Sequence, residues 1–159
     1  MNHVSSVAYE PKEFDQLYSL ELANKTLPLI QAIVGDIVAS FPYVQERHYR
    51  LTQIGRGKSG NGFSDYEDEL DSSWSILDQE RAELESYIAE LDSLGVILRD
   101  PVAGYIDFPS QYEDRPIALC WKLGEKEITH WHELEEDYCQ RKPVSLLTSE
   151  SLQSDTSYN

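Results

Sequence analysis

Residues 20–51 read LELANKTLPLIQAIVGDIVASFPYVQERHYRL, and mostly apolar side chains recur through them at alternating steps of three and four. The recurring positions are Leu20, Ala23, Leu27, Ile30, Val34, Ile37, Phe41, Val44, His48 and Leu51. A mean step of about 3.5 residues keeps these side chains on one side of an α-helix, where a second helix can pack. The stretch therefore predicts a long helix with a helical partner.

The predicted partner helix lies about twenty residues further along the chain. Its leucines recur every seven residues, at Leu70, Leu77, Leu84 and Leu91, with Trp74 and Ile88 between them. Four glycines within Gly55–Gly62 indicate the turn between the helices. Ser64 and Glu67 have the spacing of a capping box, and Gly95 is typical of a helix C-terminus. Together these patterns predict a long antiparallel helical hairpin.

Two prolines leave the bounds of the first helix open. Pro28 either kinks a helix capped by Ser19 or lies in the first turn of a helix that starts near Thr26. Pro42 raises the same question, since residues 44–54 then form either the end of the same helix or a separate one.

After Gly95 the pattern changes to short β-rich runs separated by turn signals. The runs are residues 96–98, 104–108, 117–123 and 128–131. They predict three or four antiparallel strands that form a small C-terminal sheet on the base of the hairpin. The expected fold class is therefore α+β.

The expected organisation is one domain with two tails. Residues 1–13 are polar and unpatterned, and we expect a disordered extension there. Residues 14–142 make the single domain of hairpin and β-ribbon. Residues 143–159 are rich in serine and threonine, and we expect a largely disordered tail.

The charge and composition restrict the partners. The chain of 159 residues carries a formal net charge of −16, which disfavours binding to nucleic acid or to an anionic membrane surface. No apolar run approaches the roughly 20 residues that a membrane span needs, and the N-terminus has no signal-peptide pattern. Two cysteines without an export signal suggest reduced thiols. We therefore expect a cytoplasmic protein with neither nucleic acid nor a membrane among its partners.

Five stretches taken together resemble a prokaryotic family, catalogued as domain of unknown function 2203. The stretches are Tyr18–Asn24, Leu94–Val96, Tyr105–Pro109, Leu119–Glu125 and Trp131–Glu133. The resemblance covers residues 16–143. It implies a small, soluble bacterial or archaeal protein, and the family supplies no activity to carry over.

The residues best suited to chemistry lie in the predicted sheet. They are the metal-ligand candidates His132, His130, Cys120, Glu125 and Asp107. Two histidines two positions apart share one face of a strand, and with a thiolate or carboxylate they can bind zinc or another divalent metal. The Cys-x9-His-x-His-x6-Cys spacing is not a standard zinc module. No residue is predicted to be catalytic.

Each candidate also has a structural interpretation. Cys120 is typical of a small buried side chain, and Glu125 of a hairpin turn. Asp107 is suited to accept backbone N–H groups before a proline, and His132 to a hydrogen bond at a strand end.

Strand register decides whether the candidates meet. A two-residue turn at Gly124–Glu125 places Leu119 opposite His130 and Cys120 opposite Thr129. A loop that differs by one residue places Cys120 opposite His130 instead.

The patterns favour a non-catalytic interaction protein as the first functional hypothesis. A lone hairpin of this length leaves apolar surface uncovered, and self-association into a dimer through the helices is the simplest way to cover it. The alternative is a small metal-binding protein or metal-dependent enzyme that uses the candidates in the sheet. A DNA-binding regulator is the weakest hypothesis, because the chain has no basic recognition helix.

Overall fold

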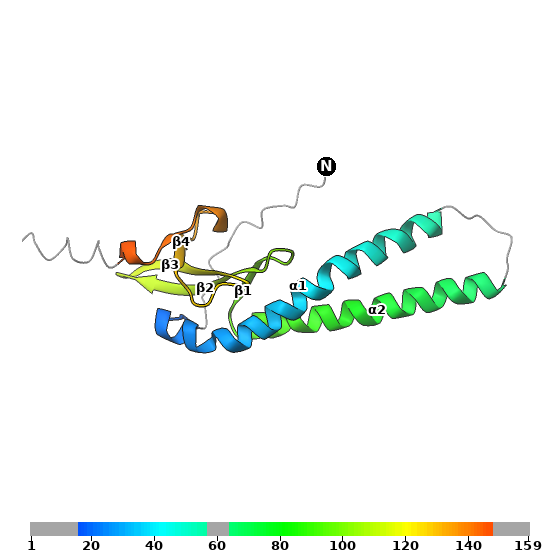
Figure 1. Cartoon of the computed structure of the whole chain (residues 1–159), viewed down its shortest axis with the longest axis horizontal. Helices are drawn as coiled ribbons and strands as arrows, with labels where there is room; N and C mark the ends of the chain where they lie inside the picture. Colours follow the sequence, from blue (N-terminus) through cyan, green and yellow to red (C-terminus); the bar gives the residue numbers. More distant parts are fainter. Residues whose placement is uncertain (1–15, 57–63, 148–159) are drawn as a thin grey trace, which may run out of the picture.

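Two long helices packed as a hairpin are followed by a five-stranded antiparallel sheet (Figure 1). The computed structural model describes residues 16–56 and 64–147. Helix α1 spans Leu20–Arg56 and helix α2 spans Ser64–Ser93. The chain is therefore α+β, as the sequence predicted.

Helix α1 runs without interruption through both prolines. The hydroxyl of Ser19 accepts a hydrogen bond from the Leu22 N–H at 3.0 Å, so Ser19 caps the helix. Pro28 and Pro42 lie inside the helix and on its exposed side. An internal proline removes one helical hydrogen bond. The buried side chains before and after each proline offset that loss. The alternatives of a helix that starts near Thr26 and of a separate helix at residues 44–54 were therefore wrong.

Helix α2 ends as the sequence predicted. Gly95 has a φ of +72°, and its N–H donates to the Asp92 carbonyl at 2.9 Å. The Val96 N–H donates to the Leu91 carbonyl at 3.0 Å. These two bonds form a Schellman motif, which satisfies the last carbonyls of the helix and turns the chain toward the sheet.

The predicted apolar lines of the two helices form the hairpin core. The buried side chains between the helices include Val44 and Leu51 of α1 and Leu77, Leu84 and Leu91 of α2. The predicted glycine-rich turn lies outside the described residues from position 57 onward.

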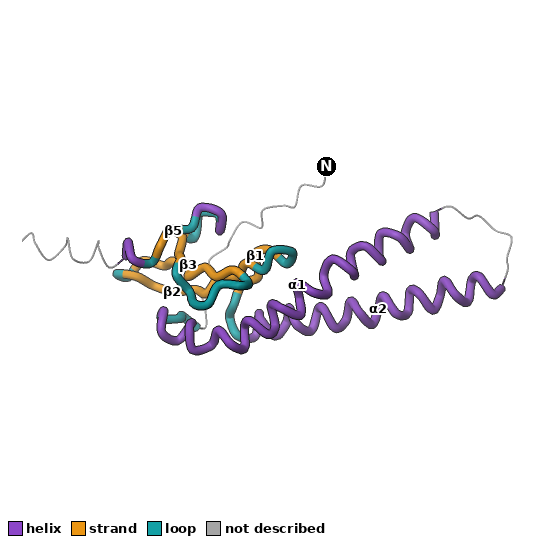
Figure 2. Tube along the Cα trace, in the orientation of Figure 1, coloured by secondary structure: helices purple, strands orange, loops and turns teal. Residues whose placement is uncertain are grey.

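The sheet has one strand more than the three or four predicted. Its strands are β1 (Ile97–Asp100), β2 (Tyr105–Tyr112), β3 (Arg115–Lys122), β4 (His130–Glu133) and β5 (Lys142–Pro143). Each strand pairs with the next in sequence order. The strands gather beside one end of the helical hairpin (Figure 2). The additional strand, β5, is only two residues long, too short to show an alternating pattern in the sequence.

One face of the sheet packs into the core with the N-terminal half of α1. Ile106, Phe108, Leu119 and Trp121 alternate along β2 and β3 and are buried there. Gly104 approaches α1 closely, because a Cβ at this position would lie 3.2 Å from methyl groups of both Val34 and Val38.

Tyr18 connects the hairpin to the sheet. Its hydroxyl donates to the Leu94 carbonyl at 2.5 Å, at the end of α2. Its ring packs edge-on against Phe108 of β2, with 5.0 Å between centroids. Its backbone N–H donates to the Pro109 carbonyl at 2.7 Å. The base of the hairpin and the sheet are therefore one packed unit.

A segment at residues 134–141 lies between β4 and β5 and includes the 3₁₀ turn Tyr138–Gln140. The Tyr138 ring lies 4.6 Å from the Tyr105 ring of β2, measured between centroids. Beyond β5, Leu147 is buried in the core. Of the predicted tail, residues 148–159 lie outside the described residues, as does the predicted N-terminal extension at 1–13.

Helix α1 also contains a strongly apolar stretch. An 18-residue window within Leu20–Gly55 has a mean hydropathy of 1.5, enough by length and composition to cross a membrane. A third of that window is buried inside the fold. Ile30, Val34 and Ile37 are among the buried residues of this helix.

Candidate functional site

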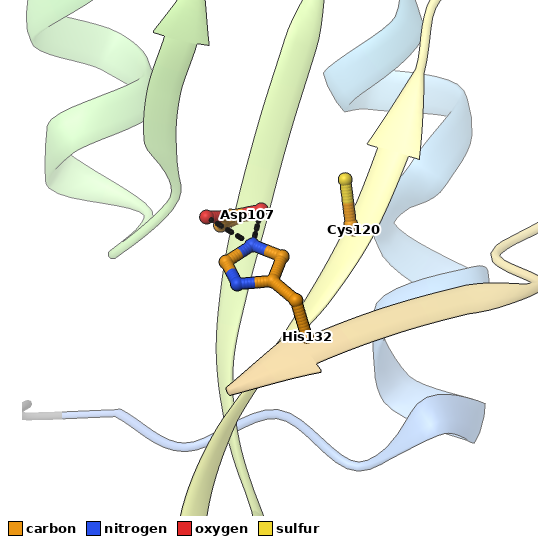
Figure 3. A group of neighbouring side chains, drawn as sticks. All are labelled: Asp107, Cys120 and His132. Atoms are coloured by element: carbon orange, nitrogen blue, oxygen red, sulfur yellow. Dashed lines mark hydrogen bonds and ion pairs between the residues drawn. The ribbon is translucent and has the colours of Figure 1, made fainter. Parts of the chain in front are cut away.

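Asp107, Cys120 and His132 meet on the face of the sheet that points away from the helices (Figure 3). Cys120 of β3 pairs with Asp107 of β2, and Ala118, two residues before Cys120, pairs with His132 of β4. Because side chains two apart on a strand share a face, all three side chains point the same way. Their ligand atoms lie within 4.8 Å of one another, and none of the three residues is exposed to solvent.

The register of β3 and β4 differs from the one expected for a two-residue turn. Cys120 pairs with His130, and Leu119 pairs with Trp131. The connection between the strands spans residues 123–129 rather than two residues. This longer loop selects the second of the two registers that the sequence left open, in which Cys120 lies opposite His130.

His132 has a hydrogen-bond acceptor at both ring nitrogens. Its Nε2 lies 2.9 Å from each carboxylate oxygen of Asp107, and its Nδ1 lies 2.7 Å from the Glu133 carbonyl oxygen. Both nitrogens are therefore positioned to donate, which requires the imidazolium form. Burial lowers the pKa of His132, but the hydrogen bond and charge of Asp107 and the Glu133 carbonyl raise it by more. The pKa of His132 thus lies above its ordinary value of 6.5.

Asp107 is held from its other side by Arg99 of β1. The Arg99 Nε donates to Asp107 Oδ2 at 2.6 Å, and the Arg99 side chain is largely buried. The predicted turn role of Asp107 was wrong, because its carboxylate binds the side chains of Arg99 on β1 and His132 on β4. Arg99 was not predicted as a site residue. It lies where the register of β1 shifts between Leu98 and Asp100, and the sequence carries no signal for that shift.

Cys120 is a protonated thiol in this environment. Burial and the negative charge of Asp107 raise its pKa from 9.0 to about 12. A nucleophilic cysteine needs the opposite shift. The arrangement is therefore unsuited to thiolate catalysis, and the predicted buried role of Cys120 is confirmed.

Glu125 and His130 form a separate group beside the three central residues. Glu125 Oε1 accepts from the Lys122 N–H at 2.7 Å and from Arg141 Nη1 at 2.6 Å. His130 Nδ1 lies 2.9 Å from the Thr129 hydroxyl and 3.8 Å from Glu125 Oε2. The predicted turn role of Glu125 is thereby confirmed, and Arg141 is a contact that sequence reasoning missed. Neither Glu125 nor His130 belongs to the central cluster.

The central cluster consists of three donors of different chemistry: a carboxylate oxygen, a sulfur and an imidazole nitrogen. Each donor comes from a different strand, so the paired sheet sets the distances between them. All three residues also lie in stretches that carry the family resemblance, Tyr105–Pro109, Leu119–Glu125 and Trp131–Glu133.

A family model described as "Uncharacterized conserved protein (DUF2203)" matches residues 16–144. No curated protein and no solved structure matches the chain.

Proposed function

This chain belongs to the DUF2203 family, and from its side chains we propose that it binds a divalent transition-metal ion at the Asp107–Cys120–His132 cluster. The observation that carries the proposal is the convergence of three ligand atoms within 4.8 Å in a fully buried position. The sequence favoured a non-catalytic interaction protein and gave metal binding as the alternative. The cluster supports that alternative for the sheet half of the molecule.

The donor set suits zinc and its neighbours among the transition metals. Zinc is bound in proteins by cysteine sulfur, histidine nitrogen and carboxylate oxygen, and the cluster offers one of each. Hard cations such as calcium and magnesium prefer oxygen ligands, and here only Asp107 supplies oxygen. The proposed ligand is therefore of the zinc class.

Neighbouring groups already hold two of the ligands in orientation. His132 Nδ1 is bonded to the Glu133 carbonyl, so Nε2 is the ring atom that faces Asp107. Metal-bound histidines usually donate their second ring N–H in this way. Arg99 fixes the carboxylate of Asp107 through Oδ2 and leaves Oδ1 free of that contact.

Charge balance also favours a divalent ion over other cations. Without metal, the imidazolium of His132 and the carboxylate of Asp107 cancel, and the Cys120 thiol is neutral. A divalent ion would displace the Nε2 proton and the thiol proton, and the thiolate and carboxylate would then cancel its two charges. The net charge of the buried cluster stays the same in both states. Because two protons leave, affinity should increase steeply with pH.

Burial suggests a structural role for the ion. Catalytic metal sites keep a position open to substrate, whereas none of the three residues is exposed. Three protein donors leave a further coordination position, but because none of the three residues is exposed, we propose that only a small ligand such as water occupies it. We propose that the bound ion stabilises the sheet and that the site binds no substrate.

Metal analysis of the full chain, purified without a histidine tag, tests the proposal. We expect about one equivalent of metal in the native protein, and a thiolate-to-cobalt absorption band after loading with Co²⁺. Cys120→Ser should abolish the band, while the matched variant Cys139→Ser should keep it, because Cys139 is exposed and outside the cluster. Absence of both bound metal and a cobalt band in the wild-type chain would overturn the proposal.

A further inference from the structure

The segment between β4 and β5, residues 134–141, crosses the face of the sheet that carries the cluster, and we call it the strap. In Figure 1 the orange chain after β4 lies on the side of the sheet opposite the helices. The strap reaches Asp100 of β1, where the Tyr138 hydroxyl donates to Oδ2 at 3.3 Å. Strands β2 and β3 lie between β1 and β4 in the sheet. The strap therefore passes over the two strands that carry Asp107 and Cys120.

Tyr138 holds the tip of the strap against β2. Its ring lies 4.6 Å from the Tyr105 ring, measured between centroids. Tyr105 is two residues before Asp107 on the same strand, so the two side chains share a face of the sheet. The stacked tyrosines therefore close one side of the cluster.

Arg141 forms a second contact on the same tyrosine. Its guanidinium lies 5.4 Å from the centroid of the Tyr105 ring, and its Nη1 donates to Glu125 Oε1 at 2.6 Å. Arg141 is also close enough to Cys120 to lower the pKa of the thiol, although burial and Asp107 raise that pKa by more. The returning end of the strap thus lies beside the sulfur.

The base of the strap is anchored separately from its tip. Glu136 accepts from the Glu133 N–H at 3.2 Å and pairs with Lys142 at 3.1 Å, which connects the base to β4 and β5. Within the strap, the Asp137 carboxylate accepts from the Cys139 N–H at 3.4 Å and caps the 3₁₀ turn. The tip can therefore lift from β1 and β2 while the turn and the base keep their own contacts.

The strap opens more easily than the opposite side of the sheet. Every residue of the strap is at least partly exposed, and the contacts that hold its tip are polar or aromatic. On the opposite side, Phe108, Leu119 and Trp121 are each at most 2% exposed and belong to the core. Segments with few buried apolar contacts open at a lower free energy than the whole fold. Lifting the strap therefore costs less than opening the core.

The cluster can be reached only if part of the chain moves. Asp107, Cys120 and His132 are each 0% exposed, and an arriving divalent ion must also let two protons leave. We propose that the strap is the gate of the cluster, and that lifting its tip admits ions and small molecules to Cys120 and its neighbours. This inference rests on the proposed metal site and adds the route to it. The gate sets the rate of exchange, while the three donors set the affinity.

Exchange kinetics of the full chain test the gate. The thiolate-to-cobalt band reports loading with Co²⁺ and release of Co²⁺ to EDTA. Tyr138→Ala frees the tip, so both rates should rise about tenfold, with the Kd nearly unchanged because both directions use the same opening. Tyr138→Phe keeps the ring and loses only the bond to Asp100, so it should raise both rates less.

Tyr49→Ala is the matched control for these rates. Tyr49 is 64% exposed and belongs to α1 rather than to the strap. Its removal should leave loading and release as they are in the wild type. Circular dichroism and urea unfolding confirm that each variant keeps the fold.

A second measurement works without metal. In metal-free Cys139→Ser, Cys120 is the remaining thiol, and methyl methanethiosulfonate can modify it only when the cluster opens. Adding Tyr138→Ala should speed this modification about tenfold. The rate should hardly change with urea well below the unfolding transition, because local opening exposes little surface. A rate that rises steeply with urea would show that Cys120 is reached by global unfolding, which overturns the gate.

The two measurements separate the gate from the metal site. If the cobalt band forms but Tyr138→Ala changes neither the exchange rates nor the thiol modification, the gate is wrong and the metal site stands. If no band forms and the thiol of Tyr138→Ala reacts faster, the metal site is wrong and the strap still controls access. Equal effects of Tyr138→Ala and Tyr49→Ala also overturn the gate.

Discussion

His132 and Asp107 lie 25 positions apart in the sequence, yet the Nε2 of the imidazole is 2.9 Å from both oxygens of the carboxylate. Neither residue is exposed, and Arg99 binds the same carboxylate from the opposite side. Strands β2 and β4 are not neighbours in the sheet, because β3 lies between them. The pair therefore bridges over β3, and together with Arg99 it links β1, β2 and β4 through charged side chains.

Removal of the imidazole should destabilise the fold strongly. His132→Ala leaves the Asp107 carboxylate buried with Arg99 as its remaining charged partner, and loss of one member of a buried ion pair costs about 3 kcal/mol or more. Urea unfolding followed by circular dichroism measures the change. His130→Ala is the control, because His130 is partly exposed and lies outside the pair. Equal destabilisation by the two variants would contradict a special role for His132.

The stability of the metal-free protein should depend on pH through His132. The pKa of His132 in the fold lies above the ordinary value of 6.5, so the folded state holds the imidazolium proton more tightly than the unfolded chain does. The contribution of His132 to the free energy of unfolding is complete below pH 6.5. It is lost as the pH rises through the pKa that His132 has in the folded state. Urea midpoints recorded from pH 5.5 upward should therefore fall over that range. If the urea midpoint of the wild type follows the same pH profile as that of His132→Ala, the pH dependence does not come from His132.

Two glycines should respond in opposite directions to alanine. Gly104 has a φ of +79°, and a Cβ there would lie 2.7 Å from the Leu123 Cβ, so Gly104→Ala should cost about 1–3 kcal/mol. Gly35 lies inside α1 with no atom within 4 Å of an added Cβ. Gly35→Ala should therefore stabilise the protein by about 0.5–1 kcal/mol. Thermal unfolding of both variants measures the difference, and a stabilising Gly104→Ala would show that the β1–β2 turn packs differently.

The two cysteines should differ sharply in reactivity. Cys139 is exposed, whereas Cys120 is buried with a pKa raised to about 12. A thiol reagent at neutral pH should modify one thiol of the native chain quickly and the second only after unfolding, because the thiolate is the reactive form. Cys139→Ser should remove the fast phase. Rapid modification of Cys120 in folded Cys139→Ser would contradict the burial of the cluster.

The helices were predictable because their signals are local. The 3.5-residue spacing, the Ser19 cap and the terminal Gly95 each act within one or two helical turns, and the structure confirms them. The prolines of α1 were ambiguous for a physical reason. Whether a helix continues through Pro28 depends on the packing of its other side, and that packing comes from α2 and from the sheet.

The residues of the candidate site could be predicted from their types, but their arrangement in space could not. Asp107, Cys120 and His132 were recognised from residue type. Their convergence depends on the register of β3 and β4, which the length of the loop at 123–129 sets. Arg99 and Arg141 had no signal in the sequence, because one reaches the site through a register shift and the other through the segment after β4.

The pattern of neighbouring residues in the sequence is enough to specify two helices and a series of short strands, because hydrophobic spacing and helix caps act between residues that are close in sequence. Which polar side chains share a buried position is settled only when the strands pair, because a shift of one residue turns every side chain to the opposite face. The same amino acids thus acquire their charge states, their partners and their proposed chemistry from contacts between residues 25 positions apart.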